Sequence, residues 1–200
     1  MSRDLFKDKS KSWDMNSKRV GNARAIAETI EKNIELKPTM KLMDFGAGTG
    51  LLSYFIAPFV EKIVMVDNSP SMLEKFKEKA SEFESETEIR EVDLSRTTLD
   101  EKFDGIISSM TIHHIEDQKA LFTKFYNMLE EGGFIAIADL DSEDGSFHSD
   151  NTGVFHFGFD REILEHIAKE IGFKNINFEL ASTINKAHCK FTVFLMIAKR

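Results

Sequence analysis

Short apolar runs alternate with amphipathic segments along most of this chain. The runs are nearly continuous in hydrophobic residues, which is typical of strands whose two faces are both buried. On this basis strands are predicted at residues 40–45, 62–67, 88–94, 103–110, 134–140, 174–183 and 190–200.

The segments between these runs carry apolar residues at the spacing of an amphipathic helix. In residues 17–35, for example, Val20, Ala23, Ala27 and Ile30 fall on one helical face. The same pattern predicts helices at residues 50–57, 70–83, 117–133 and 160–173.

Residues with strong positional preferences mark several helix ends. Ser69 and Asp160 are predicted N-caps because their side chains can accept hydrogen bonds from the free N–H groups of a first turn, and Pro70 suits the first helical position. Gly132 and Gly172 are predicted to end two helices, since glycine readily adopts the left-handed conformation found there.

Alternation of buried strands with helices predicts a parallel sheet covered by helices on both faces. Only residues 184–188 connect the last two strands, and so short a connection joins antiparallel strands. We therefore expect a doubly wound, Rossmann-like α/β fold, with a mostly parallel seven-stranded sheet, an antiparallel last strand and an extra N-terminal helix. No linker interrupts the pattern, so residues 1–200 are expected to form one domain, with residues 1–38 as an N-terminal cap segment.

Composition and charge exclude several classes of function. The 34 Asp and Glu outnumber the 26 Lys and Arg, giving a net charge of −8, so a nucleic-acid partner is not expected. The single cysteine, Cys189, allows no internal disulfide and no cysteine-pair zinc site, which fits a reducing compartment. A polar N-terminus and no apolar run of roughly 18 residues predict a cytoplasmic protein without a membrane partner. The oligomeric state stays open.

The most informative stretch is "LMDFGAGTG", residues 42–50, at the end of the first predicted strand. Gly46, Gly48 and Gly50 let the backbone turn sharply and approach a ligand without a Cβ in the way. Their spacing is one residue shorter than the G-x-G-x-x-G of dinucleotide sites, and no Lys-Ser/Thr follows, as a P-loop requires. Asp44, just before the turn, suits a ligand that carries positive charge.

This turn resembles motif I of the class I S-adenosylmethionine-dependent methyltransferases, and further motifs follow in the family's order. "VMVDNSPSML" is similar to the second-strand motif, which implies that Asp67 holds both ribose hydroxyls. "EVDL" places Asp93 where the family has an acid near the adenine amino group, and "FDGIISSMTIHHIED" resembles the fourth-strand motif. The N-terminal "KSWDMNSKRV" resembles the corresponding segment of ubiquinone-biosynthesis-like small-molecule methyltransferases.

The resemblance implies an enzyme that uses S-adenosyl-L-methionine and releases S-adenosyl-L-homocysteine. The residues implied to bind the cofactor are Asp44, Gly46, Ala47, Gly48, Gly50, Asp67, Asn68, Asp93, Leu94, Ser109, Trp13 and Arg19. No Asn/Asp-Pro-Pro-Tyr/Phe sequence of the amino-methylating DNA and protein-glutamine enzymes follows the fourth strand, so a small-molecule acceptor is favoured. Two other interpretations stay open: a non-catalytic S-adenosylmethionine-binding or regulatory protein, and a nicotinamide oxidoreductase.

Trp13 and Arg19 have two interpretations. Either they close over the cofactor, with Arg19 paired to its carboxylate, or they belong to an amphipathic helix that docks on the sheet edge with Trp13 as its apolar anchor. The sequence does not separate the two.

Four histidines are candidate general bases, because imidazole titrates near neutral pH. His113 and His114 follow the fourth strand, and His148 and His156 lie in the irregular segment 139–160. That segment is rich in phenylalanine and leaves the fifth strand at its carboxyl end, so it is expected either to form the substrate pocket or to pack as a lid. For each histidine the alternative role is a hydrogen bond to the backbone. A further alternative is a divalent metal site made by His148, His156 and the acids Asp139, Asp141, Glu143 and Asp144, but no helical His-x₃-His spacing supports it.

Overall fold

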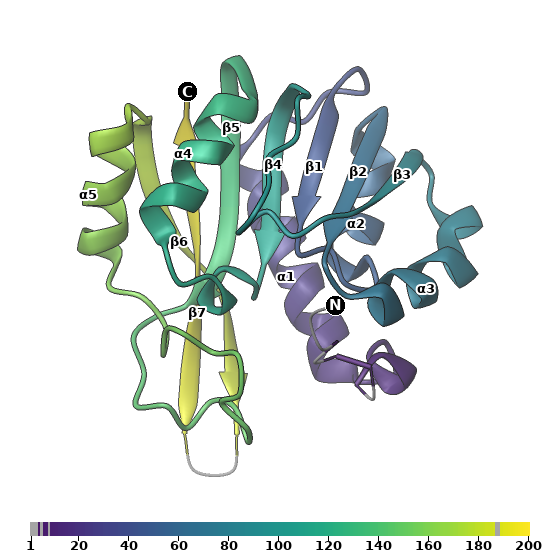
Figure 1. Cartoon of the computed structure of the whole chain (residues 1–200), viewed down its shortest axis with the longest axis vertical. Helices are drawn as coiled ribbons and strands as arrows, with labels where there is room; N and C mark the ends of the chain where they lie inside the picture. Colours follow the sequence, from purple (N-terminus) through teal and green to yellow (C-terminus); the bar gives the residue numbers. More distant parts are fainter. Residues whose placement is uncertain (1–3, 5, 8, 187–188) are drawn as a thin grey trace.

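A seven-stranded sheet is the centre of the fold. The computed structural model describes residues 4, 6, 7, 9–186 and 189–200, and within them the strand order is β3-β2-β1-β4-β5-β7-β6. The strands are β1 Lys41–Phe45, β2 Lys62–Asp67, β3 Glu86–Glu91, β4 Phe103–Ser109, β5 Leu129–Leu140, β6 Lys174–Asn185 and β7 Lys190–Lys199. Paired strands are parallel except that β7 runs antiparallel to β5 and β6 (Figure 1). This confirms the predicted fold class.

Helices cover both faces of the sheet (Figure 1). The α-helices are α1 Ser17–Asn33, α2 Leu51–Ile56, α3 Pro70–Lys79, α4 Gln118–Met128 and α5 Arg161–Ile171, and the 3-10 helices are η1 Ser10–Ser12, η2 Ala57–Phe59, η3 Ala80–Glu82 and η4 Ile112–His114. Within the residues that the structure describes, no helix has the length and apolar character needed to cross a membrane.

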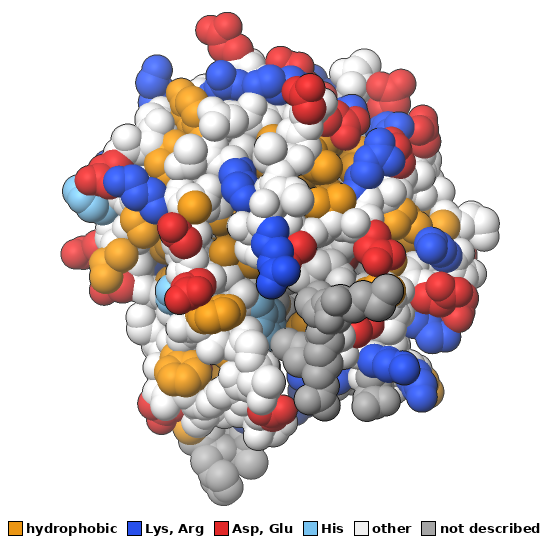
Figure 2. All heavy atoms as spheres, in the orientation of Figure 1, with side chains coloured by type: hydrophobic (Ala, Val, Ile, Leu, Met, Phe, Trp, Pro, Cys, Tyr) orange, Lys and Arg blue, Asp and Glu red, His pale blue; other side chains and the backbone are white. Residues whose placement is uncertain are grey.

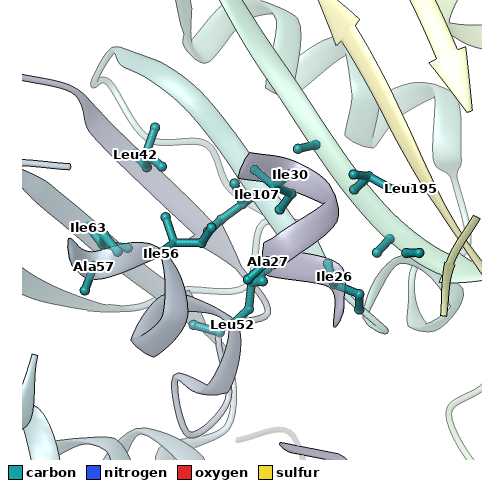
Figure 3. Close-up of a cluster of buried hydrophobic side chains, with 14 of the residues drawn as sticks. Ile26, Ala27, Ile30, Leu42, Leu52, Ile56, Ala57, Ile63, Ile107 and Leu195 are labelled. Carbon is teal, nitrogen blue, oxygen red and sulfur yellow. The ribbon is translucent and has the colours of Figure 1, made fainter. Parts of the chain in front are cut away.

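Each face of the sheet has its own apolar core. On one face Ile26 and Ile30 of α1 pack with Ile56 of α2 and Ile107 of β4 (Figure 3). On the other face the cluster is richer in rings from α4, such as Phe122 and Phe125, packed against the strands. The two cores account for the continuous apolar runs in the central strands, because both faces are withdrawn from water.

The predicted helix caps are confirmed where hydrogen bonds define them. The Ser69 side chain accepts from the Met72 N–H, and Asp160 accepts from the first turn of α5. Pro70 is the first residue of α3, and Gly172 ends α5 with a φ of 116°. Local sequence preferences therefore fix these boundaries.

The prediction of a helix over residues 117–133 is wrong at its end. Helix α4 stops at Met128, and Leu129 begins β5, so Gly132 lies inside a strand rather than at a helix C-terminus. Leu129 is fully buried and pairs with Phe103 of β4, with a register shift before Gly105. Burial against β4 therefore outweighs the helical pattern of the sequence.

The third strand also differs from its prediction. It spans Glu86–Glu91, so Asp93 and Leu94 lie in the turn beyond it. The reason is that its partner β2 ends at Asp67, which pairs with Glu91. The connection between the last two strands is shorter than the predicted 184–188, because β6 extends to Asn185. Residues 187–188 of this connection lie outside the described residues.

The strand order creates one point where the chain changes direction. Strands β1 and β4 are neighbours at the middle of the sheet, although β2 and β3 separate them in the sequence (Figure 1). The chain therefore leaves β1 toward one edge of the sheet and leaves β4 toward the other. In open α/β sheets ligands bind at the carboxyl ends of the strands at such a point.

Candidate functional site

The glycine turn lies at the carboxyl end of β1 and leads directly into α2. Backbone N–H groups of Gly46 and Ala47 donate to the carbonyl of Val66, which ties the turn to β2. All three glycines have positive φ: 68° for Gly46, 56° for Gly48 and 81° for Gly50. L side chains rarely adopt this conformation, so the turn requires glycine for its path.

Two of these glycines are required for different reasons. A Cβ on Gly46 would lie 2.1 Å from the side chain of Thr111, so the absence of a side chain allows β1 and the loop after β4 to meet. A Cβ on Gly48 would meet no atom within 4 Å. Gly48 therefore faces open space, as expected where the backbone contacts a ligand.

Asp67 ends β2 and faces the glycine turn. Its two carboxylate oxygens accept hydrogen bonds at 2.8 Å from the N–H groups of Gly48 and Ser69. Partial burial raises the pKa of Asp67, and the two N–H donors act in the opposite direction. Each oxygen keeps a second lone pair, so the carboxylate can still accept from two hydroxyl groups.

Asp44 lies beneath the same turn and is almost fully buried. Its only hydrogen-bond donor from a side chain, within the described chain, is the Ser53 hydroxyl at 2.6 Å. Burial raises the pKa of Asp44 to about 7, and the nearby charge of Asp67 adds to the rise. Two acids without a basic partner in the described residues make this end of the sheet favourable for a cation.

The raised pKa of Asp44 predicts a pH dependence of stability. The folded protein keeps the Asp44 proton up to about pH 7, whereas the unfolded chain loses it near the ordinary aspartate pKa of 3.8. The contribution of Asp44 to the free energy of unfolding therefore falls as the pH rises from about 4 to 7. The effect of D44N on stability should be more favourable at pH 8 than at pH 5, by on the order of 2 kcal/mol, in urea denaturation of the ligand-free protein. Equal effects at the two pH values would contradict this account.

The other predicted cofactor residues also lie where the parallel strands end, at their carboxyl ends. Ser109 ends β4, and exposed Asn68 follows Asp67 directly. Asp93 lies beyond β3, where one of its oxygens accepts from the N–H and hydroxyl of Ser95. Leu94 beside it is buried. The structure therefore brings these residues to one edge, although the Asp93 carboxylate is partly occupied within its own turn.

The N-terminal segment crosses this edge of the sheet. Trp13 stacks on the guanidinium of Arg19, 3.9 Å from the ring centroid, so Arg19 is held by the segment itself. Asp14 accepts from the Thr49 hydroxyl of the glycine turn at 2.5 Å and pairs with Lys79 of α3. Asp14 and Thr49 were not selected from the sequence. The feature of the sequence that could have indicated this contact is the acid directly after Trp13.

The four candidate histidines have different surroundings. His113 is buried and lies 2.8 Å from a carboxylate oxygen of Asp139 through Nδ1. The Nδ1 of His114 contacts the carbonyl of Gly153 at 2.6 Å, and the Nε2 of His156 contacts the carbonyl of Ile115 at 3.0 Å. His114 and His156 therefore have the alternative role considered above, a hydrogen bond from the ring to the backbone. The sequence indicates Asp139 only as a candidate metal ligand, yet in the structure it is the partner of His113.

His148 lies near His113, and its ring centroid is 4.9 Å from that of His113. Burial, together with electrostatic effects of the neighbouring His113 and His114, lowers the pKa of His148 to about 4. Burial likewise lowers the pKa of His114 to about 4. Both rings are therefore neutral at physiological pH. Within the described residues, no group of three or more His, Cys, Asp or Glu is arranged to hold a metal ion.

The loop after β4 is strained where it meets the glycine turn. Met110 has a φ of 56°, which is uncommon for a residue with a side chain. Its N–H donates to the carbonyl of Ala138 at 2.8 Å, and the next hydroxyl, that of Thr111, donates to Gly46 at 3.3 Å. Strained backbone held by its neighbours is common at functional sites. No pattern in the sequence indicates a special role for Met110.

Residues 141–159 form an irregular segment beside the histidines. The N–H of Phe155 donates to the carbonyl of His113 at 2.9 Å, which anchors the segment to the loop after β4. Phe159 is buried, whereas Phe155 and Phe157 are 55% and 46% exposed. Phe155 and Phe157 therefore face solvent, and the two expected roles of the segment, substrate pocket or lid, stay predictions.

Comparison with protein families identifies this arrangement. The sequence model of one family, described as a methyltransferase domain, matches residues 18–178. An uncharacterized methyltransferase of Schizosaccharomyces pombe is 30% identical over 182 residues, which is 82% of this chain and 62% of that protein. Phosphoethanolamine N-methyltransferase 1 of Zea mays is 30% identical over 162 residues, 78% of this chain and 32% of that protein. The chain spans less than two thirds of both relatives.

Solved structures have the same fold at low sequence identity. Phosphoethanolamine N-methyltransferase 2 of Haemonchus contortus, in complex with S-adenosyl-L-methionine, has a TM-score of 0.72 at 17% identity and covers 98% of this chain and 60% of its own. The N-methyltransferase NodS of Bradyrhizobium japonicum, in complex with S-adenosyl-L-homocysteine, has a TM-score of 0.70 at 14% identity. The match covers 92% of this chain and 88% of NodS.

Proposed function

The chain belongs to the class I S-adenosylmethionine-dependent methyltransferase family, and from this premise we propose that it transfers a methyl group from S-adenosyl-L-methionine to a small-molecule acceptor. The observation that carries the proposal is the glycine turn, in which Gly48 faces open space and its N–H donates to the Asp67 carboxylate at 2.8 Å. S-adenosyl-L-methionine, when bound, supplies a methyl group on a positively charged sulfur.

The residues of the turn fit this cofactor by their chemistry. Asp67 has unused lone pairs for the two ribose hydroxyls, as the family resemblance implies. Asp44 lies in an acidic environment that favours the cationic end of the ligand. Gly48 leaves room for close approach of the backbone. The chain thereby binds and orients the methyl donor, and orientation alone can contribute much of the rate enhancement for an already activated methyl group.

A small molecule is the acceptor class that the surface and the relatives favour. Figure 2 shows Lys and Arg side chains interspersed with Asp and Glu over the face in view, and the net charge is −8. Neither feature favours a nucleic-acid acceptor. Several relatives are named for a small amine acceptor, phosphoethanolamine. Because those proteins are much longer than this chain, we propose the class of the acceptor, a small molecule, and not phosphoethanolamine itself.

The test is a labelled-methyl assay with fractionated metabolite extracts. Wild-type protein is incubated with S-adenosyl-L-methionine labelled on its methyl group, and label is followed in small-molecule and macromolecular fractions. Transfer into at least one small-molecule fraction is expected. Label that stays on the cofactor in every fraction, or that enters only macromolecules, would contradict the proposal.

A further inference from the structure

Only one of the four candidate histidines is held by a carboxylate in the described structure. The Nδ1 atom of His113 lies 2.8 and 3.0 Å from the two oxygens of Asp139. Asp139 also accepts from the N–H of His113 at 3.2 Å and from the N–H of Leu140 at 2.8 Å. Both side chains are almost completely buried. The pair is therefore fixed in one orientation.

This contact decides which nitrogen of His113 carries the proton. A carboxylate has only acceptor sites, so Nδ1 must be the donor and Nε2 of the neutral ring holds a free lone pair. The Nε2 atom is buried and has no hydrogen-bond partner among the described residues. Buried polar atoms in proteins nearly always have a partner. The Nε2 atom of His148 is likewise buried without a partner among the described residues. Two unpaired ring nitrogens at the ligand-binding end of the sheet suggest a partner that comes from outside the chain.

The position of His113 is also suitable for contact with an acceptor. It belongs to η4, directly after β4, and Figure 1 shows β1 and β4 ending at the same edge of the sheet. Thr111, two residues earlier, contacts Gly46 of the glycine turn. His148 covers His113 from the segment 141–159. The pair thus lies between the cofactor turn and the segment expected to meet the substrate.

The other three candidate histidines are less suited to accept a proton. His114 and His156 are bonded to backbone carbonyls. Burial lowers the pKa of His114 and His148 to about 4, which makes both rings weak bases at neutral pH. General bases are most effective when their pKa lies near the working pH.

We propose that His113 is the general base of the methyl transfer, that Asp139 is its positioning residue, and that the acceptor therefore has a nucleophilic atom that carries a proton, as a hydroxyl or an amine does. This inference rests on the proposed function. The acceptor's O–H or N–H bond breaks and its proton passes to Nε2 of His113. The electron pair of the acceptor atom forms the new bond to the methyl carbon, and the pair of the broken carbon–sulfur bond stays on sulfur. Asp139 stabilises the imidazolium until the proton leaves to solvent.

The first test needs no acceptor. In protein labelled with 15N-histidine and saturated with S-adenosyl-L-homocysteine, NMR should find His113 with its proton on Nδ1, the signal being assigned by its loss in H113Q. The D139N variant should move the proton toward Nε2, because an amide can donate to Nδ1. A wild-type His113 with its proton on Nε2 would overturn the proposal.

The second test uses labelled S-adenosyl-L-methionine with the metabolite fraction that accepts label. H113Q and D139N should each lower the transfer rate roughly 100-fold or more with unchanged cofactor affinity by calorimetry, and the double variant should lose little more than either single one. H166Q, which alters an exposed histidine on α5, is the matched control and should transfer at the wild-type rate. Thermal unfolding of each variant checks that the fold is retained.

The outcomes separate this inference from the proposed function. If wild-type protein transfers label and D139N or H113Q transfers equally well, the base assignment is overturned and the methyltransferase proposal stands. The base assignment is also overturned if the losses of transfer rate are additive in the double variant and accompany a loss of cofactor affinity. That result would indicate a structural role for the two residues. If wild-type protein transfers no label to any fraction, the proposed function fails, and the base assignment fails with it.

Discussion

Replacement of Asp67 by alanine is expected to weaken binding of S-adenosyl-L-methionine by roughly 100-fold or more. The carboxylate is proposed to accept hydrogen bonds from two ribose hydroxyls, and hydrogen bonds to a charged group contribute about 1.5 kcal/mol or more each. Asp67 also orders the turn by accepting from Gly48, so its loss leaves the backbone less fixed. The measurement is the dissociation constant by isothermal titration calorimetry.

Asp104→Ala is the matched control for this variant. Asp104 is also half-buried and accepts from a backbone N–H, that of Lys41 at 2.8 Å, but it lies at the beginning of β4. Both variants should therefore lose some stability, whereas only the Asp67 variant should lose affinity. Similar affinities for the two variants would place the ribose elsewhere.

Gly48→Ala is expected to weaken cofactor binding by roughly 10- to 100-fold. The new methyl group would meet no atom of the protein within 4 Å, so its effect arises from the ligand and from the φ of 56°. A residue with a Cβ in this conformation costs about 1–2 kcal/mol of stability. Calorimetry gives the affinity, and chemical denaturation gives the stability.

The chain offers a close control for the conformational part of this effect. Gly132 has a φ of 78°, and a Cβ there also meets nothing within 4 Å, yet it lies at the opposite end of the sheet from the glycine turn. Gly132→Ala should cost similar stability and leave cofactor affinity unchanged. Equal affinity losses in the two variants would mean that Gly48 acts only through the fold.

The fold could be predicted from the sequence because its signals are local or periodic. The central strands are buried on both faces and therefore read as apolar runs, and Ser69 and Asp160 mark helix starts by short-range hydrogen bonds. The end of α4 could not be predicted, because the burial of Leu129 depends on its pairing with Phe103, a residue distant in the sequence. Strand pairing of this kind is tertiary and can override local propensity.

The candidate site was predictable in part for the same reason. The glycines and Asp67 belong to contiguous motifs, so their proximity follows from the strand order. The pairing of His113 with Asp139 joins the ends of β4 and β5 and depends on side-chain direction, which the sequence does not encode as a pattern. The contact of Asp14 with Thr49 likewise depends on the path of the N-terminal segment across the turn.

The most direct test of the account is calorimetric titration of the wild-type protein with S-adenosyl-L-methionine, S-adenosyl-L-homocysteine and NAD under the same conditions. The glycine spacing, the acids Asp44 and Asp67 and the family assignment predict saturable binding of the first two ligands and none of NAD. Binding of NAD in place of the two S-adenosyl ligands, or no binding of any of the three, would contradict it.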